Sequence, residues 1–160
     1  MSIKRLVTDY TGRKKDLHIV FKIDPSLATT QKMDFRFGNV SSFCAGTQKL
    51  LQRYVINLFT AVESQPNFPQ FGTNLLPKLL NGKFVGLSDV THILNFANWK
   101  VVSEFRAYQR ANPALPLDEQ LNTASVTNVA LDRGKISIKI SILTLAGEAI
   151  DFLLPLPIIK

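Results

Sequence analysis

Two glutamates, Glu63 and Glu104, are the side chains of this sequence best suited to acid–base chemistry. Each stands beside an apolar residue, Val62 or Phe105, and an apolar setting raises the pKa of a carboxyl group. Such a group, facing a second carboxyl about 5–9.5 Å away, is what glycosidases use. The alternative is that both are surface carboxylates of helices. The remaining acidic residues fall mostly at expected turns, so the sequence predicts no catalytic constellation.

The two histidines and the single cysteine predict no metal or nucleophile site. His18 falls in an expected strand and His92 on an expected helix, and neither has a second ligand at a spacing such as i+4. Cys44 lies between Phe43 and Ala45, which is typical of a small buried hydrophobe. A lone cysteine excludes an intramolecular disulfide. Glycines are isolated rather than grouped in a phosphate-binding loop, so no cofactor is expected.

The chain of 160 residues carries a formal net charge of +7, and its basic residues are clustered only near the start, at Lys4-Arg5 and Arg13-Lys14-Lys15. A basic arm over residues 1–15 can contact nucleic acid or protein, or can remain solvated. Aromatic residues are not interleaved with it, which disfavours single-strand binding. No apolar run has the length of a signal peptide or membrane span, so we expect assembly in the cytosol without membrane contact.

The candidate residues around Glu63 depend on the stretch 47–80. Its first half has the apolar spacing of an amphipathic helix, with Thr47 as the expected N-cap and one apolar stripe. The stripe consists of Leu51, Tyr54, Val55, Leu58, Phe59 and Val62. The polar side is expected to hold Lys49, Gln52, Arg53 and Asn57. Pro66 and Pro69 then end the helix, and Phe68, Phe71 and Gly72 form a turn-prone loop before a leucine-rich segment.

The remaining pattern predicts an α+β fold with N-terminal strands, two main helices and a C-terminal three-stranded antiparallel meander. Expected strands cover residues 4–8, 17–23 and 32–37, and a second helix runs from an N-cap at Ser88 to about Asn112-Pro113. The meander comprises residues 124–131, 135–142 and 149–154, and Pro155 and Pro157 should prevent regular pairing beyond it. One domain is expected over residues 31–160, preceded by an arm over residues 1–30.

The stretch 135–142 alternates strictly, with isoleucines on one face and lysine or serine on the other. A short meander has at least one edge with unpaired main-chain groups. Lys135 and Lys139 can protect that edge from aggregation, or the edge can accept a strand from another chain. The sequence leaves both possibilities open. The residues assigned to strand exchange are Lys135, Ile136, Ser137, Ile138, Lys139, Ile140, Ser141, Ile150 and Phe152.

The run QKLLQRYVINLFTAVESQPNFPQFGTNLLPKLLNGKF, residues 48–84, resembles the signature segment of the baseplate wedge and sheath-initiator family of contractile phage tails, which is related to type VI secretion baseplate subunits. The element order is similar too, over about residues 30–155. The matching residues are Leu58, Phe59, Thr60, Glu63, Pro69, Phe71, Gly72, Leu75 and Leu76. The family's Glu-Pro-Arg triplet is absent; Leu117-Asp118-Glu119-Gln120-Leu121 stands there, with Glu119 at the acidic position.

The resemblance implies a structural virion protein without enzymatic activity. It implies a tail baseplate location and contacts with the tail sheath protein, wedge proteins and tube-end or hub proteins, in about six copies, with sheath assembly nucleated by β-strand augmentation. The alternatives are a lysozyme-like muralytic tail enzyme that uses Glu63 or Glu104, and a basic virion protein that binds nucleic acid.

Overall fold

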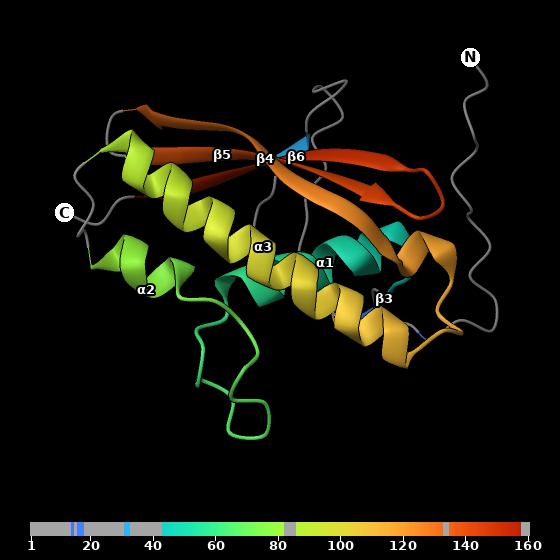
Figure 1. Ribbon diagram of the computed structural model, residues 1–160. Coiled ribbons are helices and arrows are strands. Elements are labelled where there is room, and N and C mark those ends of the chain that lie inside the picture. The colour runs from blue at the N-terminus through green and yellow to red at the C-terminus, as the bar shows by residue number, and fades with distance from the viewer. Residues whose placement is uncertain are drawn as a thin grey trace, which may run out of the picture.

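Three helices and a C-terminal antiparallel sheet occupy most of residues 43–81, 86–132 and 135–157; with residues 14, 16–17 and 31–32, these are the part of the chain that the computed structural model describes (Figure 1). The helices are α1 (Thr47–Phe59), α2 (Leu75–Leu80) and α3 (Leu87–Ala111). A 3-10 turn, η1 (Leu117–Glu119), leads into strands β4 (Leu121–Asp132), β5 (Lys135–Thr144) and β6 (Ala149–Pro157). The predicted α+β class and C-terminal meander are confirmed.

Three two-residue strands precede the helices: β1 (Asp16–Leu17), β2 (Gln31–Lys32) and β3 (Phe43–Cys44). β1 pairs with β3, and β2 pairs in parallel with β6 to give a sheet of order β2-β6-β5-β4. The expected strand at 4–8, residues 18–23 and 33–37 of the other two expected strands, the basic arm apart from Lys14, and His18 lie outside the described residues.

The core lies between the sheet and the helices α1 and α3, which both cover the same face (Figure 1). Ile136, Ile138, Ile140 and Ile142 of β5 are at most 2% exposed, as their alternation predicts. On α1, Tyr54 places its ring edge-on to that of Phe152 on β6, with 6.1 Å between the ring centroids. Burial of these aliphatic and aromatic side chains, each worth about 1.5–3 kcal/mol, holds the two layers together.

The expected polar side of α1 is largely buried, which corrects the single-stripe prediction. Lys49, Gln52 and Asn57 are only 6%, 2% and 2% exposed. α1 is covered on several sides, because η1 and the loop after the helix pack on it as well as α3. A helix with neighbours on several sides must pair its polar residues instead of hydrating them.

Both long helices begin differently from the prediction. Gly46, not Thr47, is the N-cap of α1, and Gly86, not Ser88, is that of α3. Gly46 has the left-handed φ of 63°, and its N–H donates to the Glu119 carboxylate at 3.1 Å. The Thr47 hydroxyl instead donates to Glu148. A tertiary carboxylate therefore replaces the local side-chain cap on α1. The predicted end of α3 at Asn112 is confirmed.

Strand β6 continues through Pro155 and Pro157, which corrects the expectation that these prolines prevent pairing. Pro155 pairs with Ser137 and Pro157 with Lys135. Alternate residues of an antiparallel strand direct their main-chain groups to opposite sides. Pro155 and Pro157 are two residues apart, so the N–H groups that they lack would lie on the same side of β6. That side faces away from β5, so pairing with β5 is possible.

Strand β4 contains two irregularities that the alternation did not predict. Its register with β5 shifts at Asn122 and again at Thr127, each of which is one extra residue in the strand. The second shift lets Val126 and Val129, spaced by three, both pack against the core. The Thr127 hydroxyl donates to the carbonyl of Lys139 at 3.2 Å across this bulge.

Candidate functional site

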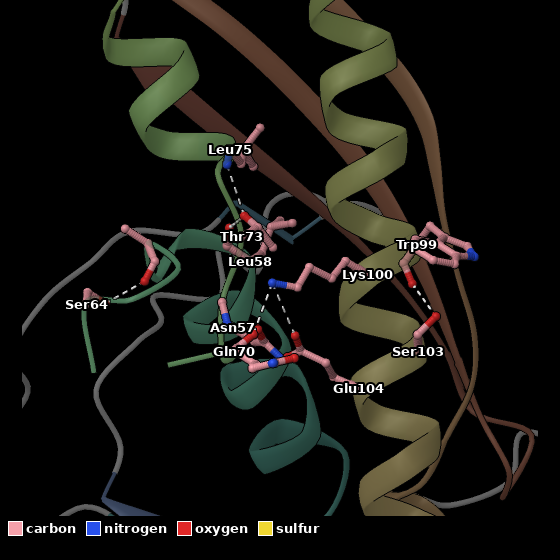
Figure 2. Close-up of polar contacts among 12 residues, drawn as sticks. Asn57, Leu58, Ser64, Gln70, Thr73, Leu75, Trp99, Lys100, Ser103 and Glu104 are labelled. Atoms are coloured by element: carbon pink, nitrogen blue, oxygen red, sulfur yellow. Dashed lines mark hydrogen bonds and ion pairs between the residues drawn. The ribbon is translucent and has the colours of Figure 1, made fainter. Parts of the chain in front are cut away.

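The residues of the sequence signature build a loop that folds back on the end of α1. Thr60 ends the helix, and its carbonyl accepts the N–H of Thr73 at 2.7 Å. The Thr73 hydroxyl donates to the carbonyl of Leu58 at 2.6 Å and accepts the N–H of Leu75 at 3.1 Å (Figure 2). Thr73 therefore connects the end of α1 to the start of α2. The predicted turn-prone character of this segment is confirmed, and the short helix α2 was not predicted.

Gly72 is the one position of this loop where no other residue fits. Its φ is +93°, and a Cβ placed there would lie 2.3 Å from the carbonyl oxygen of Thr60. Its N–H also donates to the side-chain oxygen of Asn57 at 3.1 Å in a buried environment. Backbone conformation and close approach both require glycine here.

Glu63 takes a backbone role in the same loop. It is exposed and has a φ of 67°, which is uncommon for a residue with a side chain. Its N–H donates to the carbonyl of Pro69 at 3.0 Å and closes the tip of the loop. The tip, residues 64–70, is exposed, and Phe68 within it is 67% exposed.

Polar side chains attach the loop to α3 (Figure 2). Asn57 accepts from Gly72 and donates to the carboxylate of Glu104 at 2.8 Å. Lys100 donates to the carbonyl of Gln70 at 3.0 Å, and its Nζ lies 3.7 Å from Glu104. Each group thus satisfies a partner on another element, so Asn57, Lys100 and Glu104 work as one bracket between α1, α3 and the loop.

The structure does not bring the two candidate acid–base residues into a shared cleft. Glu104 lines a cavity of about 310 Å³. Glu63 is on the exposed loop, outside the lining of that cavity. The lining residues are Arg53, Ile56, Asn57, Phe71, Glu104, Phe105 and Tyr108. Among these, Glu104 is the sole carboxylate, and the Arg53 guanidinium stacks 4.3 Å from the centre of the Tyr108 ring.

Glu119, in η1, is part of a buried ion pair that the sequence did not predict. Its carboxylate lies 2.9 Å from the Nζ of Lys49, and the two side chains are 4% and 8% exposed. Lys49 also donates to the carbonyl of Lys14 at 3.0 Å. The pair joins the first turn of α1 to η1, across 70 residues. The one signal of this ion pair in the sequence is the position of Lys49 directly before the apolar residues Leu50 and Leu51.

The residues predicted for strand exchange lie in two neighbouring strands, and one of these strands is interior. β5 pairs with β4 on one side and with β6 on the other, so its main-chain groups are used within the chain. Ile136, Ile138, Ile140 and Phe152 point into the core, and Ile150 is packed against it. Lys139 pairs with Asp151 at 3.3 Å on the other face of the sheet. A hydrogen bond from Ser141, and then Lys139, hold the pKa of Asp151 below its usual value.

The outer edge of β6 is partly closed. β2 pairs with it at Phe152 and Leu153. Beyond that point, Pro155 and Pro157 present no N–H on the side of β6 that faces away from β5, because proline has no main-chain N–H. An incoming strand would find acceptors there without the matching donors, so this edge is a poor template for strand addition.

The outer edge of β4 is closed at its beginning and open toward its end. Gln109 of α3 bonds both main-chain groups of Leu121, at 3.0 and 3.1 Å, as a neighbouring strand would. Asn98 donates to the carbonyl of Ala124 at 2.9 Å. From Val126 onward, no strand in the described ranges pairs with this edge.

The register shows which groups of β4 face this open side. Pro155 has no N–H to give to β5, so its partner Ser137 directs its own N–H and C=O groups away from β6 and toward β4. There Ser137 pairs with Ala130. Ala130 therefore faces β5, and its neighbours Val129 and Leu131 direct their N–H and C=O groups outward. Leu131 is 48% exposed. Within the described ranges no strand takes these groups.

Other kinds of site receive no support from the described residues. No group of three or more His, Cys, Asp or Glu among them is placed to hold a metal ion. None of the helices in the described ranges is long and apolar enough to cross a membrane. Cys44 is buried, and this burial, together with Asp16, raises the pKa of its thiol to about 11, so it is a poor nucleophile.

Comparison of the sequence with known families and with characterised proteins finds no match. Among solved structures, the crystal structure of a proposed tail lysozyme from Geobacter sulfurreducens is similar, with a TM-score of 0.47 and 11% sequence identity. The similarity covers 74% of this chain and 96% of that one. At this TM-score the likeness is weak and assigns no function.

Proposed function

We propose that this chain is a structural protein of a contractile phage tail baseplate, without enzymatic activity, which joins wedge and tube-end proteins and starts the sheath by accepting a strand. The observation that carries the proposal is the open edge of β4 over Val129–Leu131, whose outward main-chain groups have no strand partner in the described ranges. The likeness of the loop over residues 48–84 to the signature of the sheath-initiator family supports the same assignment.

The mechanism is the addition of a strand from a sheath subunit to β4. Main-chain N–H and C=O groups of Val129 and Leu131 supply the hydrogen bonds, which are sequence-independent. Side chains set the register, because a shift by one residue would move every side chain of the added strand to the other face. β5 and β6 need not open, so the added strand leaves the buried core intact.

The loop helps to position α3, and α3 holds the first part of β4. Asn57, Glu104 and Lys100 attach the loop to α3, and α3 in turn caps the first part of β4 through Asn98 and Gln109. A ring of about six copies, as the family resemblance implies, would present six such edges in one orientation.

The test uses a proline at a position whose N–H faces outward. Leu131→Pro removes a donor from the open edge without breaking the β4–β5 ladder, whereas Ala130→Pro removes a ladder donor and serves as the unfolded control. Leu131→Ala is the matched control for the lost side chain. We expect Leu131→Pro to give folded protein and baseplates without sheath, and Leu131→Ala to give normal tails, as seen by electron microscopy.

Sheathed tails from folded Leu131→Pro protein would reject strand addition at this edge. The muralytic alternative is tested separately with Glu104→Gln and Glu63→Gln in a peptidoglycan turbidity assay. If the unmodified chain clears the peptidoglycan suspension and either substitution abolishes this clearing, the structural assignment is replaced by an enzymatic one. Strongly salt-dependent DNA binding that requires residues 1–15 would instead favour the nucleic-acid alternative.

A further inference from the structure

The solvent-facing side of α3 carries a continuous stripe of exposed residues. They recur at spacings of four and three, which places them on one line along a helix, over roughly 27 Å. Together they form what we call the α3 stripe: His92, Phe96, Trp99, Ser103, Arg106 and Arg110. The stripe is aromatic in its first half and basic in its second half. Trp99 and Ser103 lie on the side of α3 away from the Asn57–Glu104 bracket (Figure 2).

The aromatic half of the stripe is unusually exposed. Phe96 and Trp99 are each 64% exposed, and their ring centroids are 5.9 Å apart with the planes inclined at 34°. They are not needed for the core, which α3 reaches with Val90, Leu94 and Val101 on the opposite side. Large aromatic side chains that remain in water are the commonest anchors of protein interfaces.

A hollow of about 230 Å³ adjoins Phe96 on one side. Leu75, Ile93 and Ala97 contribute apolar lining, and Lys78 and Lys100 contribute cationic groups. Its size is close to that of one or two aliphatic side chains. A surface with an apolar depression beside two exposed rings is suited to side chains inserted from a partner.

The charge around the stripe is positive and uncompensated. None of the carboxylates that the structure describes pairs with Arg106 or Arg110. The acidic residues of α3 are Asp89, in its first turn, and Glu104, which Asn57 and Lys100 already engage. The Nε of Arg110 donates to the carbonyl of Arg106 at 3.2 Å, and the charge of both guanidinium groups remains to attract carboxylates of another molecule.

Charge also disfavours two other occupants of this surface. The first fifteen residues of this chain carry Lys4, Arg5, Arg13, Lys14 and Lys15 against the single acid Asp9, so this segment would be repelled by the arginines. A second copy of the chain, with a net charge of +7, would meet the same repulsion. The complementary partner is acidic.

We propose that the α3 stripe binds an acidic amphipathic helix of another protein. Apolar residues of that helix, at spacings of three and four, cover Phe96 and Trp99 and enter the adjoining hollow, and its carboxylates lie over Arg106 and Arg110. Helix packing on a straight stripe of this length follows the usual ridge-and-groove geometry. The acidic end of the partner lies toward the C-terminus of α3.

Nucleic acid fits this surface less well, although arginine and aromatic residues also bind single strands. The two rings pack on one another, and the hollow beside Phe96 combines an apolar lining with Lys78 and with Lys100, which Gln70 and Glu104 already engage. The positive charge of the stripe itself is confined to its second half, whereas a phosphate backbone needs charge along its whole path.

The test is a selection of helical peptides on the intact, immobilised chain. A displayed library of peptides of about 18 residues, or five turns, has apolar residues fixed at spacings of three and four and all other positions random. We expect the retained peptides to be enriched in Asp and Glu at one end. Repeating the selection on Arg106→Glu/Arg110→Glu protein should shift that enrichment to Lys and Arg.

Binding of the best peptide is then measured through Trp99, the single tryptophan of the chain. Burial of this exposed indole should shift its emission to the blue. Phe96→Ser should weaken binding about 30-fold, as removal of an interface anchor does, while Leu117→Ser, at another exposed apolar residue, should leave it unchanged. Circular dichroism checks that each variant is folded.

Three outcomes would overturn the proposal. These are selected peptides without acidic enrichment, binding that is indifferent to Phe96 and the two arginines, and a stronger emission change with single-stranded oligothymidine of about 15 nucleotides than with any peptide. Because these readouts do not involve the edge of β4, their failure leaves the proposed sheath contact untouched, and the reverse also holds.

Discussion

Gly72 is the residue on which the signature loop depends most directly. Gly72→Ala should cost about 2–4 kcal/mol of unfolding free energy, because it adds a clash with the Thr60 carbonyl to an unfavourable positive φ. Gly147→Ala is the matched control, since Gly147 has a φ of +83° and nothing within 4 Å of the added Cβ. It should cost only about 1 kcal/mol. Equal losses in urea unfolding would show that the close approach to Thr60 is unimportant.

Asp151 makes the stability of the sheet depend on pH in the acidic range. Hydrogen bonding from Ser141 and the charge of Lys139 lower its pKa in the folded protein, so its contribution to stability is complete above the unfolded value of about 3.9. The contribution disappears as the pH falls through the lowered folded pKa. With its side chain 35% exposed, water screens the pair, and we expect less than about 1 kcal/mol.

Comparing Asp151→Asn with the unmodified chain measures this contribution. The difference in urea unfolding free energy should be constant from pH 7 to pH 5 and should shrink as the pH falls through the lowered pKa of the folded protein. A difference that grows as the pH falls would have the wrong sign and would contradict the assignment.

Single residues also show why the site was only partly predictable. Gly72 was identified because turn chemistry is local, whereas Thr60 was identified only through the family resemblance. Glu119 and Lys49 were not paired, because 70 residues separate them and nothing in either neighbourhood requires the other. Glu104 was selected for its apolar neighbour, yet its partners Asn57 and Lys100 engage it as part of a bracket.

At the scale of elements, the pair between Lys49 and Glu119 anchors α1. Glu119→Gln should cost about 3 kcal/mol, because it leaves the ammonium group of Lys49 buried without a counter-charge. Lys49→Met combined with Glu119→Leu removes both charges and should be more stable than either single substitution. Urea unfolding of the unmodified chain, Lys49→Met, Glu119→Leu and the double variant gives the coupling free energy. Additive effects would show that the two residues are independent.

The elements themselves were predicted with uneven success. Alternation located β5 well, because an interior strand with one buried face has a strict period of two. β6 was predicted too short, since proline was treated as incompatible with any pairing and not only with pairing on one side. β4 was also predicted short, and its bulge at Thr127 depends on packing that local sequence does not encode.

At the scale of the whole molecule, the side chains of α3 protect part of the sheet from self-association. Gln109→Ala combined with Asn98→Ala should expose the main-chain groups of Leu121 and Ala124 and thereby lengthen the open edge of β4. We expect a higher tendency to associate, measured by light scattering of folded protein at increasing concentration. Ser103→Ala, on the outer side of α3, is the control and should behave like the unmodified chain.

The two prolines of β6 have a consequence for direction. Within the described part of the chain, β2, Pro155 and Pro157 make one side of the sheet a poor template for strand addition, so β4 is the better edge for extension. Such a molecule is suited to begin a series of added strands and is poorly suited to be inserted between two others. The preferred side of strand addition thus depends on two N–H groups that are missing from one strand, β6.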